Sequence, residues 1–360
     1  MARRVILFCM ASCLAQLGAL AQGAASVPLD SSVKFTAFLD VYYAYDFGHS
    51  SDDDRQAFLY QYDRHSEVDL NLGLVQVEYE RTAVRAALGL MAGTYAQANM
   101  INEPELLRNV QEARVGLRLN TKGSLWLDAG VFTSHIGSES AIGIDNWTLT
   151  RSVLAENSPY YLSGAKLTWK ASDRLEITAL FMNGWQRIRR IQNRTPCLGS
   201  QVLWKVNDEM KLNWSTFAGS DVPDSLGYYR IYNDLWWSLE RPTWGLQLCV
   251  DAGIQQNDGA QWEPWGGAIA TVRRKLSDRW TGVVRAETYS DPEQVILYTG
   301  TPHGYSLVGY SIGCDLQVAP DSFLRFEART FHGADAIFAD VHGSTQDNTA
   351  ITVSAAVRFR

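Results

Sequence analysis

The sequence lacks an apolar run of membrane-helix length beyond its first residues. A transmembrane helix needs about 20 predominantly apolar residues, whereas this 360-residue chain is 46% hydrophobic with a mean hydropathy of -0.16. After residue 21, polar residues interrupt every apolar stretch. If the mature chain crosses a membrane, it must therefore cross with strands.

Basic charge and cysteine are also scarce. The chain has 32 Lys and Arg against 39 Asp and Glu, a net charge of -7, so it lacks the basic face of a nucleic-acid-binding protein. Only Cys197, Cys249 and Cys314 follow the N-terminal apolar run. Disulfide-stabilised exported domains usually have an even number of closely spaced cysteines. The pattern predicts free thiols that serve as small apolar side chains.

Signatures of catalysis and metal binding are missing from the sequence as well. It contains neither an HExxH nor a GxSxG motif, and its histidines show no paired metal-ligand spacing. His135, Ser138 and Glu139 are the closest trio that could form a hydrolytic site, but proximity within one loop is weak evidence. The sequence therefore predicts no enzymatic activity, no cofactor and no metal site.

The N-terminal apolar run has the pattern of a secretory signal peptide. Arg3 and Arg4 precede an apolar stretch that ends in small residues at Ala21. We expect residues 1–21 to direct export through the Sec pathway, with cleavage near Ala21, and residues 22–32 to form a periplasmic segment. Removal of the two arginines changes the net charge to 30 - 39 = -9.

From residue 33 onward, apolar and polar residues alternate in about sixteen stretches. Alternation of period two is typical of strands with one apolar face. The stretches run roughly over residues 33–46, 65–80, 81–93, 109–120, 123–134, 160–170, 173–185, 197–206, 209–219, 228–240, 242–255, 264–276, 278–290, 304–318, 321–331 and 346–360. Very short and long connectors alternate between them. This rhythm predicts an all-β, up-and-down antiparallel barrel over residues 33–360, with tight turns at one end and long loops at the other.

Tryptophans gather near the ends of the predicted strands. Six stand near short connectors and three near long ones: Trp126, Trp169, Trp204, Trp237, Trp244 and Trp280, and then Trp185, Trp262 and Trp265. Because indole rings favour the membrane interface, this placement predicts an aromatic girdle at each end of an outer-membrane barrel.

Five segments carry a more specific pattern: FLDVYYAYDF (38–47), VQEARVGLRL (110–119), LWLDAGVFTSHIGSES (125–140), ENSPYYLSGAKLTW (156–169) and LFMNGWQRI (180–188). Together they resemble the OmpL-like β-barrel porins, porin-2 type, of Bacteroidetes outer membranes, and the resemblance extends over about residues 33–360. It is most specific at SHIGSES and NGWQRI. It implies a passive outer-membrane channel and leaves the solute open.

The longest connector, residues 134–158, follows the fifth predicted strand. By similarity to general porins, this loop would fold inward and narrow the pore. Its charged residues Glu139, Asp145, Arg151 and Glu156 are then the candidate constriction residues. The alternative is a surface loop that packs on its neighbours.

Charged residues also recur at inward positions of the predicted strands. An arginine that faced lipid at the bilayer midplane would cost about 2 to 4 kcal/mol, so these side chains should line the lumen or pair with one another there. The set is Arg85, Glu112, Arg114, Arg118, Asp128, Arg285, Glu287, Arg325, Glu327 and Arg329.

These observations predict a porin for passive diffusion of small hydrophilic solutes or ions through a charged lumen. Its expected partners are outer-membrane lipid, lipopolysaccharide and the solute, with no nucleic acid, and a homotrimer is compatible with its size. The alternative hypothesis is a non-conducting barrel whose extracellular loops bind a ligand or partner. A barrel hydrolase ranks third.

Overall fold

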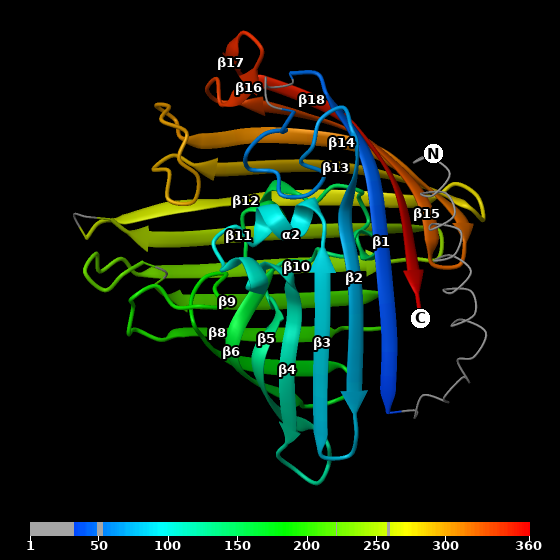
Figure 1. Cartoon of the computed structure of the whole chain (residues 1–360), viewed down its shortest axis with the longest axis vertical. Helices are drawn as coiled ribbons and strands as arrows, with labels where there is room; N and C mark the ends of the chain where they lie inside the picture. The colour runs from blue at the N-terminus through cyan, green and yellow to red at the C-terminus, as the bar shows by residue number, and fades with distance from the viewer. Residues whose placement is uncertain (1–31, 49–52, 221, 258–259) are drawn as a thin grey trace, which may run out of the picture.

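The computed structural model describes residues 32–48, 53–220, 222–257 and 260–360, in which sixteen strands close into one antiparallel barrel (Figure 1). The predicted fold class is therefore confirmed, whereas the signal-peptide prediction lies outside the described residues. The barrel strands are β1 (Val33–Asp46), β2 (Val68–Glu80), β3 (Val84–Ala92), β4 (Val110–Arg118), β5 (Leu125–Thr133), β6 (Tyr161–Lys170), β7 (Leu175–Met182), β8 (Cys197–Lys205), β9 (Met210–Gly219), β10 (Arg230–Glu240), β11 (Trp244–Gln256), β12 (Trp262–Lys275), β13 (Trp280–Asp291), β14 (Tyr305–Ala319), β15 (Ser322–Gly333) and β18 (Asp347–Phe359).

The barrel is apolar outside and largely polar inside, as the alternation requires. Outward-facing Leu39, Val115 and Ile312 are 47%, 57% and 64% exposed, whereas Asp40 and Arg325 on the inner face are almost fully buried. A β-strand directs successive side chains to opposite faces. One local sequence pattern thus makes both a lipid-compatible exterior and a charged interior.

Strand β1 closes the barrel by pairing with β2 on one side and β18 on the other. The β1–β18 register runs from Ala37 opposite Phe359 to Asp46 opposite Ala350. Inside the barrel, Asp40 accepts hydrogen bonds from Ser354 and from Tyr62 Oη, the latter at 2.7 Å. Among the described residues, closure leaves none of the sixteen barrel strands with an unpaired edge. A bilayer requires this because lipid offers no hydrogen-bonding partner.

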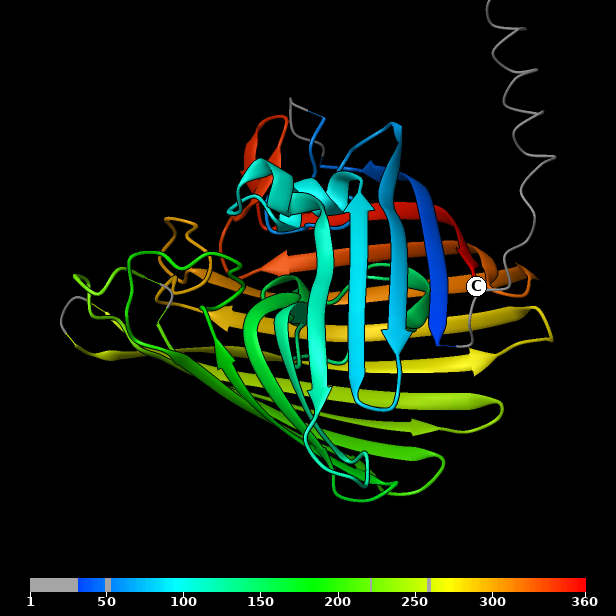
Figure 2. The ribbon, with the colours of Figure 1, turned by 60° about the horizontal axis from the view of Figure 1, so that its bottom comes forward.

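The long connectors gather at one end, here called the long-loop end, and the tight turns at the other, the short-turn end (Figure 2). The connectors contain α2 (Thr94–Asn99), η1 (Glu105–Asn109), η2 (Gly143–Asp145), α3 (Val153–Glu156) and the hairpin β16 (Phe338–Asp340) with β17 (Gly343–Thr345). In the described residues, none of the helices has the length and apolarity to cross a membrane. In Figure 1, β1–β4 cross steeply over β8–β14, because opposite walls of a barrel tilt in opposite directions.

The prediction of two tryptophan girdles is wrong for three of the nine residues. Trp126, Trp185 and Trp265 are only 6%, 9% and 4% exposed and face the interior. Trp169 and Trp204 near the tight turns are exposed, as predicted. Proximity to a strand end therefore identifies the height of a tryptophan in the barrel but not the face it occupies.

Two glycines allow close backbone contact between neighbouring strands, Gly130 of β5 with β4 and Gly164 of β6 with β7. Gly130 and Gly164 stand opposite each other in the register of β5 and β6, with φ values of 131° and 154°. A Cβ atom on Gly164 would overlap the carbonyl oxygen of Phe181, and one on Gly130 that of Ala113. Side chains other than hydrogen are therefore excluded at both positions.

The replacement Gly164→Ala should lower the free energy of unfolding by about 2 kcal/mol or more, because it adds a backbone clash to a strained φ. Urea titration of the refolded barrel in detergent, read from its heat-modifiable gel mobility, measures the change. Gly227→Ala is the control, since Gly227 has φ 69° but no heavy atom near its Cβ position, and it should cost only about 1 kcal/mol. Equal losses would show that the close approach of these strands is unimportant.

Candidate functional site

The loop between β5 and β6 crosses the barrel interior. It leaves β5 at Ser134 and reaches β13, which stands eight strands from β5 in either direction around the barrel. The Val153 N–H donates to Glu287 Oε2 and the Thr150 N–H to Glu327 Oε2, both at 2.8 Å. Arg325 Nη1 donates to the carbonyl of Gly143 at 2.5 Å. The inward course predicted for this loop is therefore present in the structure.

Buried charges fasten the loop to the far wall. The Arg285 side chain is fully buried and lies 3.0 Å from Glu327, 3.3 Å from Glu287 and 3.7 Å from Glu139 of the loop. Arg329 donates to Glu287 from Nε at 2.9 Å and from Nη2 at 2.8 Å. Buried charges are tolerated when each is paired and hydrogen-bonded, and removal of one partner is costly. The wall supplies three acids for its three arginines, since Asp315 of β14 pairs with Arg325 at 2.7 Å. The loop adds Glu139 and further hydrogen-bond partners for these buried groups.

A second buried pair joins three of the long loops. Arg151 Nη2 donates to Glu156 Oε2 at 2.8 Å, and both side chains are almost fully buried. The Arg151 guanidinium stacks 3.3 Å from the ring centroid of Tyr160 and 5.1 Å from that of Tyr95. The Tyr60 N–H from the β1–β2 loop donates to Glu156 at 3.0 Å. This pair therefore orders the mouth of the barrel.

The four predicted constriction residues differ in their surroundings. Glu139, Arg151 and Glu156 are buried in the pairs described above, and burial raises the pKa of the Glu139 carboxyl. Asp145 is 43% exposed at its side chain and lies 2.5 Å from Arg358 of β18. Their role at a constriction stays a prediction. What the structure adds is that three of them hold the loop in place.

The ten predicted lumen charges form two groups on opposing walls. On β3–β5, Asp128 pairs with Arg85 and with Arg114, which also bonds Glu112 at 2.5 Å. Arg118 belongs to the same wall, near the tight turn at Gly123. The other five, on β13 and β15, are Arg285, Glu287, Arg325, Glu327 and Arg329. Most of these charges are therefore paired rather than free in the lumen.

Sequence reasoning missed an apolar cluster that fills part of the interior near the long-loop end. Phe58 from the β1–β2 loop packs against Tyr305, Phe331 and Phe338 at ring-centroid distances of 4.9, 6.2 and 5.8 Å. The other buried aromatic members are Phe132, Trp185, Phe217, Tyr232, Trp265 and Tyr289. The available signal was the aromatic residues at inward positions in the long-loop halves of β9–β15.

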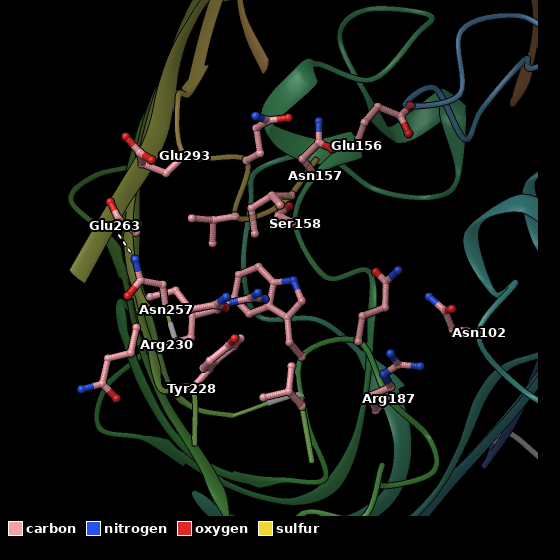
Figure 3. A pocket seen from close by; sticks show the side chains of 18 of the residues that line it. Asn102, Glu156, Asn157, Ser158, Arg187, Tyr228, Arg230, Asn257, Glu263 and Glu293 are labelled. Carbon is pink, nitrogen blue, oxygen red and sulfur yellow. Dashed lines mark hydrogen bonds between the residues drawn. The ribbon is translucent and has the colours of Figure 1, made fainter. Parts of the chain in front are cut away.

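Two cavities flank the β5–β6 loop. The outer cavity, about 580 Å³, opens at the long-loop end and is lined by residues that include Tyr60, Trp185, Arg187 and Gln255 (Figure 3). The inner cavity, about 500 Å³, lies between the loop and the wall β2–β6, where Glu78, Glu112, Arg114, Glu139 and Lys166 line it. The loop therefore leaves open space both at the long-loop end and along the wall β2–β6, and charged side chains line part of each cavity.

The segment NGWQRI (183–188) borders the outer cavity, to which Trp185, Gln186 and Arg187 contribute side chains. Gln186 accepts a hydrogen bond from the Tyr160 N–H at 2.9 Å and donates one to the Asn99 carbonyl at 3.3 Å. Its φ of 54° is unusual for a residue other than glycine. Ile188 N–H donates to buried Glu103 at 2.7 Å. This motif therefore connects three long loops through its own backbone and amide.

His135, Ser138 and Glu139 do not assemble into a hydrolytic centre. His135 Nε2 donates to the Thr216 carbonyl at 2.8 Å, and Glu139 accepts from the backbone N–H of Ser152 at 3.0 Å. Burial lowers the pKa of His135 to about 4. This histidine anchors the start of the loop to β9 as a neutral side chain.

In the described part of the chain, Asp234, Cys249 and Asp251 are the group of potential ligands close enough to hold a metal ion. Asp234 and Asp251 stand opposite each other on β10 and β11. The Cys249 thiol donates to Asp234 Oδ2 at 3.2 Å and Asn213 Nδ2 donates to Oδ1 at 3.3 Å. These hydrogen bonds give each oxygen of the Asp234 carboxylate a partner within the protein. The three cysteines are free thiols, as predicted.

Comparison with known proteins places the chain among outer-membrane barrels. Residues 32–359 match the family model described as "Putative beta-barrel porin-2, OmpL-like". The chain is similar to the anion-selective porin from Comamonas acidovorans (TM-score 0.62, 10% identity, 92% of this chain and 100% of that one). It is also similar to the outer membrane channel DcaP of Acinetobacter baumannii (0.60, 8%, 91% and 97%) and to the trimer form of OmpT from Vibrio cholerae (0.61, 7%, 91% and 99%). No curated protein sequence matches. At such identities the structural likeness shows the fold alone.

The change Arg151→Met should release the loop, because it leaves Glu156 buried without its cation. Such losses cost about 3 to 5 kcal/mol, so hydrogen exchange of the amides near residues 150–158 should accelerate by about two orders of magnitude or more. The double variant Arg151→Met/Glu156→Gln should recover much of the protection, and Arg189→Met, on an exposed loop, should have no effect. Unchanged exchange in Arg151→Met would contradict the fastening role.

Acidification should weaken the anchor at His135. The unfolded histidine titrates near 6.5 and the folded one near 4, so the unfolded chain binds the extra proton between these values. Stability is therefore complete above about pH 6.5 and falls by on the order of 3 kcal/mol as the pH approaches 4. His135→Gln keeps a donor for Thr216 and should lose less over this range. Urea midpoints at pH 7.5 and 4.5 compare the two proteins, and parallel losses would exclude His135 as the cause.

Proposed function

The chain belongs to the OmpL-like beta-barrel porin family, porin-2, and we propose that it forms a passive outer-membrane channel for small hydrophilic solutes and ions. The observation that carries the proposal is the loop of residues 134–158, which is fastened to β13 and β15 and leaves a polar cavity against the wall β2–β6. Polar space beside an inward loop is what a constricted water-filled path needs.

The proposed path follows the wall β2–β6 toward the short-turn end. Glu78 and Arg114 line both the inner cavity and a further cavity of about 370 Å³ near Lys34 and Arg85. Two cavities that share lining residues are adjacent, so polar space extends along this wall. On the other side, the aromatic cluster around Phe58 occupies the interior at the long-loop end. Solutes would therefore pass the charged wall.

Acidic and basic groups face this path together. Glu139 and Glu112 line it with Arg114 and Lys166, an arrangement that favours polar solutes over apolar ones. We further propose that outer-membrane lipid contacts the apolar exterior and that lipopolysaccharide meets the loop rim. The trimer form of the Vibrio cholerae structure supports a homotrimer. A non-conducting barrel is the second candidate, favoured by the apolar filling of the interior.

Purified protein in a planar bilayer should give discrete conductance steps. The variant Lys166→Gln should retain the steps and shift the reversal potential in a salt gradient toward cation selectivity, because it removes a positive charge that lines the inner cavity.

Lys122→Gln is the matched control, since Lys122 is exposed in a tight turn, and it should leave the reversal potential unchanged. A barrel that is folded by gel mobility but gives no steps would sink the channel proposal. If Lys166→Gln gives conductance steps with an unchanged reversal potential, the path lies elsewhere in the lumen.

A further inference from the structure

We propose that the outer cavity is a binding site for a neutral, polyhydroxylated solute of the size of a disaccharide or trisaccharide. The inference deepens the proposed function and rests on it, since the bound molecule would occupy the entrance of the path. The cavity has a volume of about 580 Å³, within the range of about 300 to 1,000 Å³ typical of small-molecule sites.

The site is assembled from elements far apart in the sequence. Figure 3 shows Glu263 and Glu293 on one side of the cavity and Asn102 and Arg187 on the other, with Tyr228 between them. Glu156, at the end of α3, and the following residues Asn157 and Ser158 line the cavity from the β5–β6 loop. A concave surface built from several loops of a rigid barrel is a common setting for recognition.

The charges of the cavity balance. Arg187 and Arg230 are matched by Glu263 and Glu293, and the remaining acid, Glu156, is neutralised by Arg151 behind it at 2.8 Å. A site selective for anions or cations carries an excess of the opposite sign. This balance favours a solute without net charge.

Side-chain amides dominate the lining, with seven among nineteen residues. An amide group both donates and accepts hydrogen bonds, as does a sugar hydroxyl, so the two are complementary in any orientation. Several of these groups are held in place. Gln255 Oε1 accepts from Arg230 Nε at 2.8 Å, and Asn257 Nδ2 donates to Glu263 at 2.6 Å. Fixed polar groups reduce the entropy lost on binding.

Aromatic surface completes the site. Trp185 is held edge-on by Phe217 and Tyr232 at centroid distances of 5.0 and 4.9 Å, with the Arg230 guanidinium 4.8 Å above its ring. Because this packing leaves Trp185 only 9% exposed, most of the accessible aromatic surface comes from Tyr60 and Tyr228, which are half-buried and also line the cavity. The C–H faces of a pyranose ring are apolar and pack on such surfaces, while its hydroxyls face the amides. The combination of fixed amides, aromatic rings and balanced charge is what points to a carbohydrate.

Calorimetric titration of the folded barrel in detergent tests the site without requiring conduction. Maltotriose should give a saturable heat that triglycine and gluconate do not give. The double variant Asn102→Ala/Gln256→Ala, at two lining amides, should weaken maltotriose binding at least fivefold. Gln97→Ala removes an exposed amide of α2 outside the lining and should bind as the parent does.

The outcomes separate the two proposals. Binding that is saturable, sugar-selective and weakened by the double variant alone supports the site, even if no conductance steps appear and the channel proposal fails. Conductance steps without a maltotriose heat would overturn the site and leave the channel. A preference for triglycine or gluconate, or equal binding by the double variant, would also overturn it.

Discussion

A charged side chain in a membrane-spanning strand must face the lumen, because exposing it to lipid is costly in free energy. There the charge must still be paired, because the interior of this barrel is packed closely enough to bury Arg285 and Arg325 almost completely. The wall does not supply all of the partners. Glu139 and the backbone of the β5–β6 loop complete the set, so the loop is ordered by the same constraint that orders the strands. Fold and candidate site are therefore consequences of one requirement.

The strands could be predicted from the sequence more fully than the contacts of the inward loop. All sixteen barrel strands overlap the stretches of alternating sequence, because period-two alternation is a local property that the membrane enforces along the whole strand. The inward loop was expected from its length and its place after the fifth strand. The partners of its charges were not, since Thr150 meets Glu327 across 177 residues and no local pattern encodes that contact. Likewise, Trp185 and Trp265 could not be assigned a face, because aromatic residues occupy both faces of the strands near the long-loop end.

The interior of the barrel differs in character from one region to another. Along β2–β6, charged inward side chains such as Glu112 and Arg114 stand beside an apolar cluster that includes Leu72 and Met91, and two adjoining cavities remain. Near the long-loop end of β9–β15, aromatic residues from strands and loops pack together, and Phe58 contacts three of them. Gln186 stands where the loops meet, with both ends of its amide bonded. The proposed permeation route would therefore depend on side-chain chemistry as well as on barrel diameter.

The pairing of β1 with β18 also bears on how the molecule is assembled. Asp46 bonds Asn348 across 302 residues and Asp40 bonds Ser354 across 314. Contacts of such sequence separation form last, because the entropy of closing the intervening chain must first be offset by other contacts. Until the final strand arrives, the first strand presents a row of unsatisfied backbone groups that can pair with another chain. Because β1 is synthesised long before β18, its unpaired edge must be kept from pairing with other chains until the barrel closes. Pairing of the thirteen-residue strand β18 with β1 is the step that converts the open sheet into a barrel.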